Sequence, residues 1–211
     1  MKWDNKMKNV DAYIEMYKDS YINKKRERLP KTLISKEDTK CRLYALYILA
    51  VQSRGGVCIN DENTMSKIDK VTEWLHSSDR RGLFLCGNIG NGKTTMIRAI
   101  GAMFRYKAVT VEAEEIYYNF RNTERPYYYP DNLLLIDDLG AEPERCNVFG
   151  VDYHPLSDLL LNRYARNLTT VIATNLTYEE FKSRYGDRVY DRLLEMFIAL
   201  EYDAPSYRGR V

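Results

Sequence analysis

The sequence lacks an apolar run long enough to cross a lipid bilayer. A membrane-spanning helix needs roughly 20 consecutive apolar residues, and no stretch of the 211 residues approaches that length. The charged start MKWDNKMKNVD also lacks the apolar segment of a secretory signal. We therefore expect a soluble, cytoplasmic protein that does not interact with a membrane.

Cysteines are few, and their spacing is irregular. Cys41, Cys58, Cys86 and Cys146 form no paired pattern, which argues against a disulfide framework and against a zinc knuckle. The formal net charge of only +2 is too small to identify a nucleic-acid-binding protein. The chain has no internal repeat, and its 45% content of hydrophobic residues argues against wholesale disorder.

The N-terminal part is expected to be helical. The first 30 residues fit a polar helix, and residues 37–53 fit a strongly apolar one. A third helix is expected to begin near residues 61–63. We therefore divide the chain into a small helical region at residues 1–62, which would bind a partner, and a catalytic core at residues 63–211.

From about residue 78 short apolar strands alternate with helices. The strands are expected at 82–86, 107–112, 132–140 and 168–175, and the helices at 92–104, 113–121 and 154–167. The strands are continuous apolar runs rather than apolar–polar alternations, a pattern typical of a parallel sheet covered on both faces. The sequence therefore predicts a three-layer α/β domain.

The stretch LFLCGNIGNGKTTM contains the pattern G-x-x-x-x-G-K-[ST] between a predicted strand and a predicted helix. A glycine-rich turn in that position lets successive backbone N–H groups surround a phosphate, and the following helix offers its positive end. Lys93 is expected to reach the β- and γ-phosphates, and the Thr94 hydroxyl to ligate Mg²⁺. The residues expected to bind the nucleotide are Gly87, Asn88, Ile89, Gly90, Asn91, Gly92, Lys93, Thr94 and Thr95.

Two acidic residues end the strand expected at 132–140. LLLIDDLG places Asp137 and Asp138 at its carboxyl end, and ligands of an open α/β sheet bind at that edge. We assign Asp137 to Mg²⁺, usually through water, and Asp138 to orienting or polarising the attacking water. The alternative is that both acids only cap the next turn. This alternative argues more strongly against Asp138 as a catalytic base than against a functional role for the pair.

The next buried strand ends in IATN, so Asn175 emerges at the same edge of the sheet. Asparagine is also a common turn former, but the register with the two preceding motifs favours a polar sensor of the terminal phosphate.

Three arginines follow at four-residue intervals, Arg184, Arg188 and Arg192. Residues four apart on a helix share a face, so at least Arg188 and Arg192 should point the same way. A salt-bridged surface is one explanation. We favour the other, an arginine that a neighbouring subunit delivers to a transferring phosphoryl group.

The segments GNIGNGKTT, LLLIDDLGAE, VIATNLTYEEF, GDRVYDRL and SYRGRV together resemble the AAA+ ATPases of the DnaC/IstB type, over roughly residues 70–211. That family includes bacterial and phage helicase loaders and the ATPase helpers of transposases. The resemblance implies ATP and Mg²⁺ as cofactors and a compact P-loop NTPase core of the AAA+ kind without a separate lid domain.

The resemblance also implies roles for single residues. Asn175 would be the sensor 1 residue, Arg192 the arginine finger acting in trans, and Arg208 the sensor 2 arginine that touches the nucleotide in cis. Arg188 would be a second interface arginine or the finger itself. Many AAA+ proteins carry glutamate where this chain has Asp138, and Glu142 is a less favoured substitute for that acid.

The leading hypothesis is an ATP-hydrolysing replication protein that assembles as a homo-oligomer on single-stranded DNA and loads a replicative helicase. The first alternative keeps the same ATPase with a transposase as partner. A small-molecule P-loop kinase is a second alternative, and a module whose nucleotide is purely structural is a third.

Overall fold

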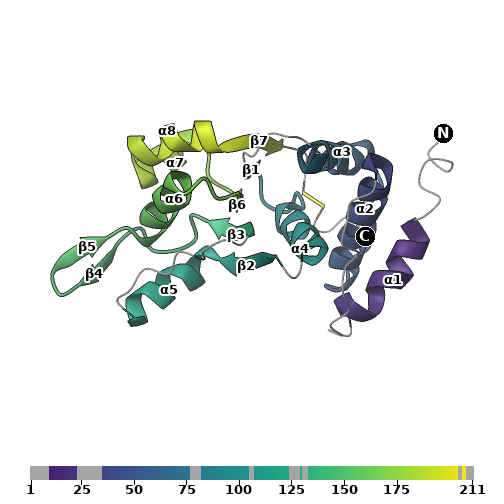
Figure 1. Cartoon of the computed structure of the whole chain (residues 1–211), viewed down its shortest axis with the longest axis horizontal. Coiled ribbons are helices and arrows are strands. Elements are labelled where there is room, and N and C mark those ends of the chain that lie inside the picture. Colours follow the sequence, from purple (N-terminus) through teal and green to yellow (C-terminus); the bar gives the residue numbers. More distant parts are fainter. Residues whose placement is uncertain are drawn as a thin grey trace. The chain divides into compact units, whose positions relative to one another are not determined.

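The computed structural model describes residues 10–22, 35–76, 82–104, 107–123, 129, 133–203 and 206–207. The chain divides into two compact units. The helical unit comprises residues 1–79, 98–106 and 207–211, and the sheet unit comprises residues 80–97 and 107–206. Figure 1 labels the elements of both. None of the helices in the described ranges is long and apolar enough to span a membrane.

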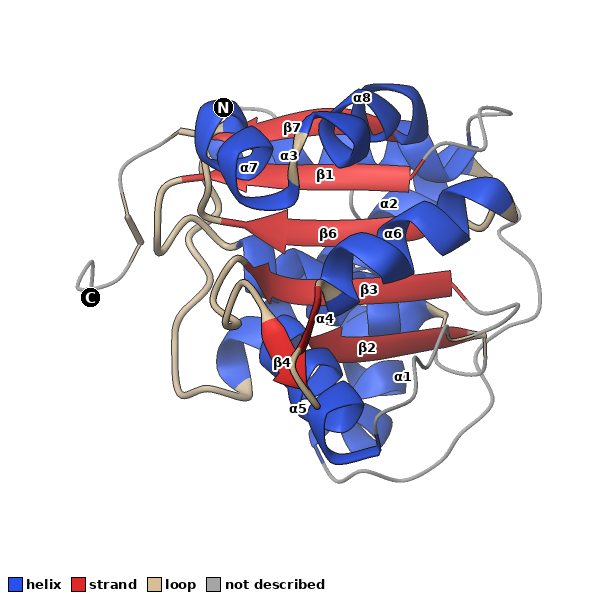
Figure 2. Ribbon diagram, turned by 90° about the vertical axis from the view of Figure 1, so that its left-hand side faces the viewer, coloured by secondary structure: helices blue, strands red, loops and turns tan. Residues whose placement is uncertain are grey.

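A five-stranded parallel sheet forms the centre of the sheet unit. Its strands are β1 (Gly82–Gly87), β2 (Ala108–Glu112), β3 (Leu133–Leu139), β6 (Thr170–Thr174) and β7 (Phe197–Tyr202). Their spatial order is β2-β3-β6-β1-β7, and each neighbouring pair is parallel. As Figure 2 shows, β6 therefore lies between β1 and β3. The prediction of a parallel α/β sheet is confirmed.

The four predicted strands and three predicted helices all form, each within about two residues of its expected ends. The helices of this part of the chain are α4 (Lys93–Met103), α5 (Ala113–Thr123) and α6 (Pro155–Ala165). Leu83, Phe84 and Leu85 of β1 are each 0% exposed. Successive strand residues point to opposite faces, so their burial means that both faces of β1 are covered. The Phe84 ring packs edge-on against Phe181 at 5.5 Å between centroids.

Several elements of the sheet unit were not predicted. β7 pairs with β1 along its whole length, from Gly82 opposite Phe197 to Gly87 opposite Tyr202. A short antiparallel hairpin, β4 (Cys146–Val148) and β5 (Val151–Tyr153), precedes α6.

The arginine-rich segment is two helices rather than one, α7 (Tyr178–Tyr185) and α8 (Asp187–Met196). Gly186, with a φ of 85°, separates them. Arg184 therefore lies on α7, whereas Arg188 and Arg192 share α8.

The helical unit contains α1 (Val10–Ile22), α2 (Lys36–Gln52), α3 (Glu62–His76) and the end of α4. α2 begins at Ser35, whose hydroxyl accepts a hydrogen bond from the Asp38 backbone N–H at 3.0 Å. The start of α3 matches the expectation near residues 61–63, and the whole of α3 lies in the helical unit. The boundary between a partner-binding region and an ATPase core stays a prediction.

Candidate nucleotide-binding site

The glycine-rich loop joins β1 to α4. Gly87, Gly90 and Gly92 have φ values of 125°, 85° and 87°, which L side chains rarely adopt. A Cβ atom added at Gly87 would lie 2.5 Å from the backbone oxygen of Tyr202. The loop thus requires glycine at Gly87 for two independent reasons, backbone conformation and close contact with β7.

The end of β7 holds the loop in place. The Tyr202 backbone oxygen accepts hydrogen bonds from the Asn91 side-chain amide at 2.6 Å and from the Asn88 backbone N–H at 3.2 Å. Asn91 is 0% exposed, so its side chain supports the loop from behind. Asn91 is one of the residues that the sequence pattern predicts to bind nucleotide, and its supporting role depends on β7, which the pattern does not predict.

Lys93 lies inside the loop. Its ammonium group donates hydrogen bonds to the backbone oxygens of Gly87 at 2.7 Å and Asn88 at 2.8 Å. The residue is only 5% exposed and stands at the first position of α4. A cation at the positive end of a helix, enclosed by a loop of backbone groups, is suited to a polyanion such as a nucleotide phosphate.

The two predicted magnesium ligands are in contact. The Thr94 hydroxyl donates a hydrogen bond to the Asp137 carboxylate at 3.1 Å, although 43 residues separate them along the chain. Asp137 is 6% exposed. A hydroxyl and a carboxylate beside a phosphate loop are the oxygen ligands that Mg²⁺ prefers, and this ion usually takes the rest of its ligands from water and phosphate. The residues therefore fit the metal.

Asp138 points away from its neighbour. It has a φ of 50°, its side chain is exposed, and its backbone N–H donates to the Asp137 carboxylate at 3.1 Å. The pairing of β3 with β6 shifts register between Ile136 and Leu139. Such bulges re-aim side chains and are common beside active sites. The bulge turns Asp137 inward and leaves the Asp138 carboxylate accessible to water.

Asn175 follows β6 directly and is exposed. Leu85 of β1 pairs with Ala173, and Leu139 of β3 pairs with Thr174. Asn175 therefore emerges between the end of the phosphate-loop strand and the end of the strand that carries the two aspartates. This is the position that the sequence predicted for a polar group facing a terminal phosphate.

The Glu142 carboxylate is buried in hydrogen bonds within the protein. Its side chain is 2% exposed and accepts hydrogen bonds from the Gly140 backbone N–H at 2.8 Å and the Tyr185 hydroxyl at 2.5 Å. A buried carboxylate satisfied by these donors does not face solvent water, so the structure argues against Glu142 as a substitute for Asp138. Its contacts with α7 had no signal in the sequence.

Arg188 and Arg192 both lie on α8, one turn apart, as predicted. Arg188 is exposed. Arg192 is 3.0 Å from Glu195 and 3.3 Å from Asp191, and its guanidinium lies 4.9 Å from the ring centre of Tyr164. Among the described residues neither arginine bonds to the phosphate loop or to Asp137.

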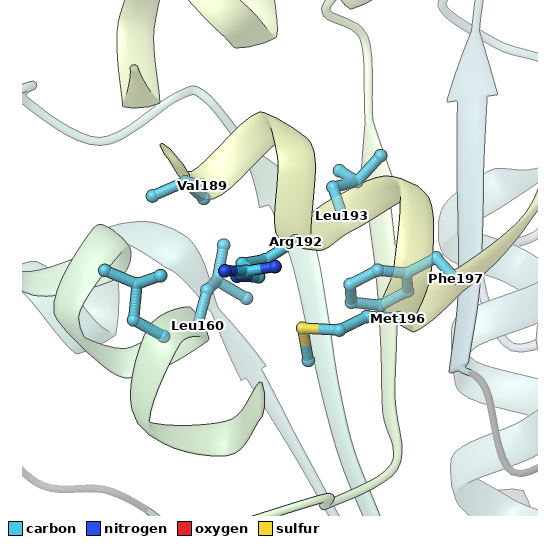
Figure 3. A pocket seen from close by; sticks show the side chains of 7 residues that line it. Leu160, Val189, Arg192, Leu193, Met196 and Phe197 are labelled. Atoms are coloured by element: carbon cyan, nitrogen blue, oxygen red, sulfur yellow. The ribbon is translucent and has the colours of Figure 1, made fainter. Parts of the chain in front are cut away.

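Arg192 also lines a small apolar pocket between α6 and α8. Figure 3 shows its side chain among those of Leu160, Val189, Leu193 and Met196. Its stem is therefore packed, while its charged end interacts with acidic neighbours on its own helix. The two arginines of α8 thus differ: Arg188 projects into solvent and Arg192 is held locally.

Arg208 lies outside the described residues. Tyr207, the residue before it, is bound to the start of α3 within the helical unit: its hydroxyl donates to the Asp61 carboxylate at 3.0 Å and accepts from the Asn63 side chain at 2.8 Å. This attachment is not predictable from the sequence, because nothing local marks Tyr207 and Asp61 as neighbours.

No protein-family model matches the chain, and the comparison with curated proteins gives no significant match. Solved structures do match. The structure of DnaI aligns with a TM-score of 0.56 at 20% identity, over 73% of this chain and 89% of that one. A candidate primosome component from Streptococcus pyogenes serotype M3 aligns with a TM-score of 0.55 at 17% identity, over 72% of this chain and 85% of that one.

The replication initiator DnaA, in a structure with AMPPCP and single-stranded DNA, aligns with a TM-score of 0.51 at 19% identity. The match covers 70% of this chain and 49% of DnaA, so this chain corresponds to about half of that protein. At these identities the matches show the fold. The chain has the fold of the matched DnaI and DnaA structures, and the resemblance to DnaC-type proteins is confirmed at that level.

Proposed function

We propose that this chain is an ATP-binding and ATP-hydrolysing replication protein that loads a replicative helicase onto single-stranded DNA. The observation that carries the proposal is the contact between Thr94 and Asp137 at 3.1 Å beside the enclosed Lys93 ammonium. A glycine-rich turn alone binds many anions. The addition of a buried carboxylate paired with the loop threonine is specific to a phosphate chain that carries a divalent cation.

In the proposed mechanism the loop amides and Lys93 hold the β- and γ-phosphates. Thr94 and Asp137 would hold Mg²⁺, which when bound offsets the charge of the phosphate oxygens. Asp138 orients or polarises the attacking water from the exposed side of the bulge, and Asn175 donates its amide toward the terminal phosphate or that water. The resemblance to DnaC-type proteins assigns a nucleotide contact to Arg208 as well, a residue outside the described part of the chain.

A second copy of the chain completes the site. Among the residues that the structure describes, Arg188 is exposed, Arg192 contacts Asp191, Glu195 and Tyr164, and neither bonds to the loop of its own chain. An arginine supplied in trans stabilises the charge that develops on a transferring phosphoryl group. ATP then favours a homo-oligomer, because the arginine of one subunit binds the nucleotide of its neighbour, and hydrolysis releases that contact.

The choice of helicase loading rests on the fold matches with DnaI and DnaA. The matched DnaA structure contains single-stranded DNA, and we propose the same ligand for the assembled form of this chain. The helical N-terminal region would bind the helicase, leaving the sheet unit to bind nucleotide and DNA.

Steady-state ATP turnover with and without single-stranded DNA tests the enzyme part of the proposal. We expect magnesium-dependent turnover that DNA stimulates and that both Lys93→Ala and Arg192→Ala abolish. Turnover that is lost in Lys93→Ala but survives both Arg192→Ala and Arg188→Ala would refute the site shared between subunits. Transfer of phosphate to an added nucleoside in place of water would establish a kinase instead.

Co-purification with replication proteins, in ATP and in a slowly hydrolysed analogue, tests the partner. Retention of a hexameric helicase in the analogue and its release in ATP is the expected result. Retention of a transposase and not of a helicase would replace loading with the transposase-helper function.

A further inference from the structure

Glu142 joins two parts of the sheet unit that the proposed mechanism uses separately. One of its carboxylate oxygens accepts from the Gly140 backbone N–H at 2.8 Å, in the turn after β3. The other accepts from the Tyr185 hydroxyl at 2.5 Å, at the end of α7. Arg184 adds a charged contact, with its guanidinium 3.5 Å from the same carboxylate and hydrogen-bonded to the Glu142 backbone oxygen.

This cluster is buried. Glu142 is 3% exposed and Tyr185 is 9% exposed, and burial together with the carboxylate of Glu142 raises the pKa of Tyr185. A buried carboxylate is tolerated only when its oxygens are paired, and here every donor comes from the turn or from α7. The loss of one donor therefore disturbs both segments at once.

On one side the cluster fixes the turn that follows Asp138. The Ala141 backbone N–H donates to the Asp138 backbone oxygen at 3.0 Å. Gly140 has a φ of 104°, and a Cβ atom there would lie 2.7 Å from the Leu176 side chain. The turn is therefore closely packed, and the position of Asp138 depends on it.

On the other side the cluster fixes the start of α8. Tyr185 ends α7, Gly186 follows, and the Tyr190 backbone N–H donates to the Gly186 oxygen at 3.1 Å in the first turn of α8. The arginines that α8 would present to a neighbouring subunit stand two and six residues beyond Gly186.

We propose that Glu142 is a positioning residue that links the two halves of the proposed reaction within one subunit. Through Gly140 it sets the turn that carries Asp138, and through Tyr185 and Arg184 it sets the helix that carries Arg188 and Arg192. The state of a subunit's own nucleotide is thereby coupled to the arginines it offers to the next site. This inference rests on the proposed function, because it needs a site shared between subunits.

Mixing two variants, each deficient in a different half of the shared site, tests the link to Asp138 and the link to α8 separately. Donor subunits carry Asp138→Asn and keep both arginines. Acceptor subunits carry Arg188→Ala with Arg192→Ala and keep the aspartates. Alone, each variant keeps only residual turnover, about 100-fold below that of the unaltered protein for the donor, and the mixture gains activity only where a donor arginine enters an acceptor site.

Tyr185→Phe removes one hydroxyl from the cluster and is placed in the donor alone or in the acceptor alone. We expect the turnover of the mixture to fall by about 5- to 20-fold in either case, within the range of measured couplings between sites. Tyr118→Phe is the matched control, because this tyrosine of α5 is 46% exposed and lies outside the cluster. Glu142→Gln, which keeps the size of the side chain, should repeat the result.

If Tyr185→Phe in the donor leaves the turnover of the mixture unchanged, the link to α8 is refuted, even if thermal unfolding shows a loss of stability. If Tyr185→Phe in the acceptor leaves the turnover of the mixture unchanged, the link to Asp138 is refuted. A reference mixture without activity would instead refute the shared site, and the proposed link with it. Nucleotide affinity of each variant, expected to be unchanged, shows that the phosphate loop is intact.

Discussion

The phosphate loop and helix α8 carry the two kinds of residue that the proposed reaction needs, and they are built in opposite ways. Asn91, Lys93 and Asp137 are buried, and the bonds shown for them lie within the site or in the strands behind it. Arg188 is exposed, and the charged end of Arg192 contacts Asp191 and Glu195 on its own helix and the ring of Tyr164. In the proposed reaction the first region acts within its own chain, and the second acts on the site of a neighbouring chain.

The difference has a physical basis. A site for a polyanion works best when its donors are fixed before the ligand arrives, since no ordering cost then remains. An arginine that serves another subunit must instead stay at the surface until assembly. Nucleotide binding should therefore survive changes in α8, whereas hydrolysis should not.

The largest effect is expected for Lys93→Ala. The substitution removes a cation from the centre of the loop, and a hydrogen bond to a charged group contributes about 1.5 to 3 kcal/mol. ATP affinity should fall by about 100-fold and turnover should be lost, as titration with a fluorescent nucleotide and steady-state assays will show. Lys107→Ala, at an exposed lysine of the same unit, should change neither. An unaltered affinity would mean that the loop does not bind phosphate.

The next largest effect on turnover is expected for Arg188→Ala or Arg192→Ala. Because an arginine in trans can accelerate phosphoryl transfer by about 10³-fold or more, the finger is identified as the residue whose loss lowers kcat by that factor. ATP affinity measured at low protein concentration should be unchanged in both variants. A comparable loss of affinity would contradict the division between the two regions.

Asp138→Asn should lower kcat by about 100-fold, the usual contribution of a group that orients or accepts a proton. The affinity for magnesium and ATP should be retained, because Asp137 and Thr94 remain in place. Asp138→Glu restores the acid at a longer reach and should recover most of the activity. Equal turnover in all three proteins would remove Asp138 from the mechanism.

The smallest effect is expected for Glu195→Gln, which removes the carboxylate 3.0 Å from Arg192. Exposed ion pairs contribute about 0.2 to 1 kcal/mol, so turnover of the assembled form should rise by no more than about fivefold as Arg192 is released. A fall in turnover would show that Glu195 aims the arginine rather than retaining it. The Arg192→Ala variant should be insensitive to the same change.

Much of the sheet unit was predictable from local patterns. The strands β1, β3 and β6 are continuous apolar runs, and each is followed by polar residues that the parallel sheet brings to one edge. The spacing of the glycines and Lys93 matches the pattern of a phosphate-binding loop, and Asp137 stands at the end of a buried strand. These signals are local, so a single sequence suffices to find them.

The missed features have weak local signals. β7 mixes buried and exposed residues without regular alternation and contains the exposed Glu201, so it resembles neither a buried strand nor a clear surface one. The β4–β5 hairpin turns at Phe149 and Gly150 with φ values of 50° and 80°, where asparagine and glycine are the usual pair. Gly186 divides the arginine series, although a single glycine inside a helical pattern is often tolerated.

Chain order and composition were sufficient to specify the fold class, the phosphate loop and the edge of the sheet at which the polar residues meet, because each depends on neighbours a few positions apart. Three features depended on packing between distant segments: the Tyr202 support behind the loop, the exposure that separates Arg188 from Arg192, and the pairing of Glu142 with Tyr185 across 43 residues. Such contacts arise only when the sheet assembles, since hydrogen bonds and burial act through space and leave no periodic trace along the chain.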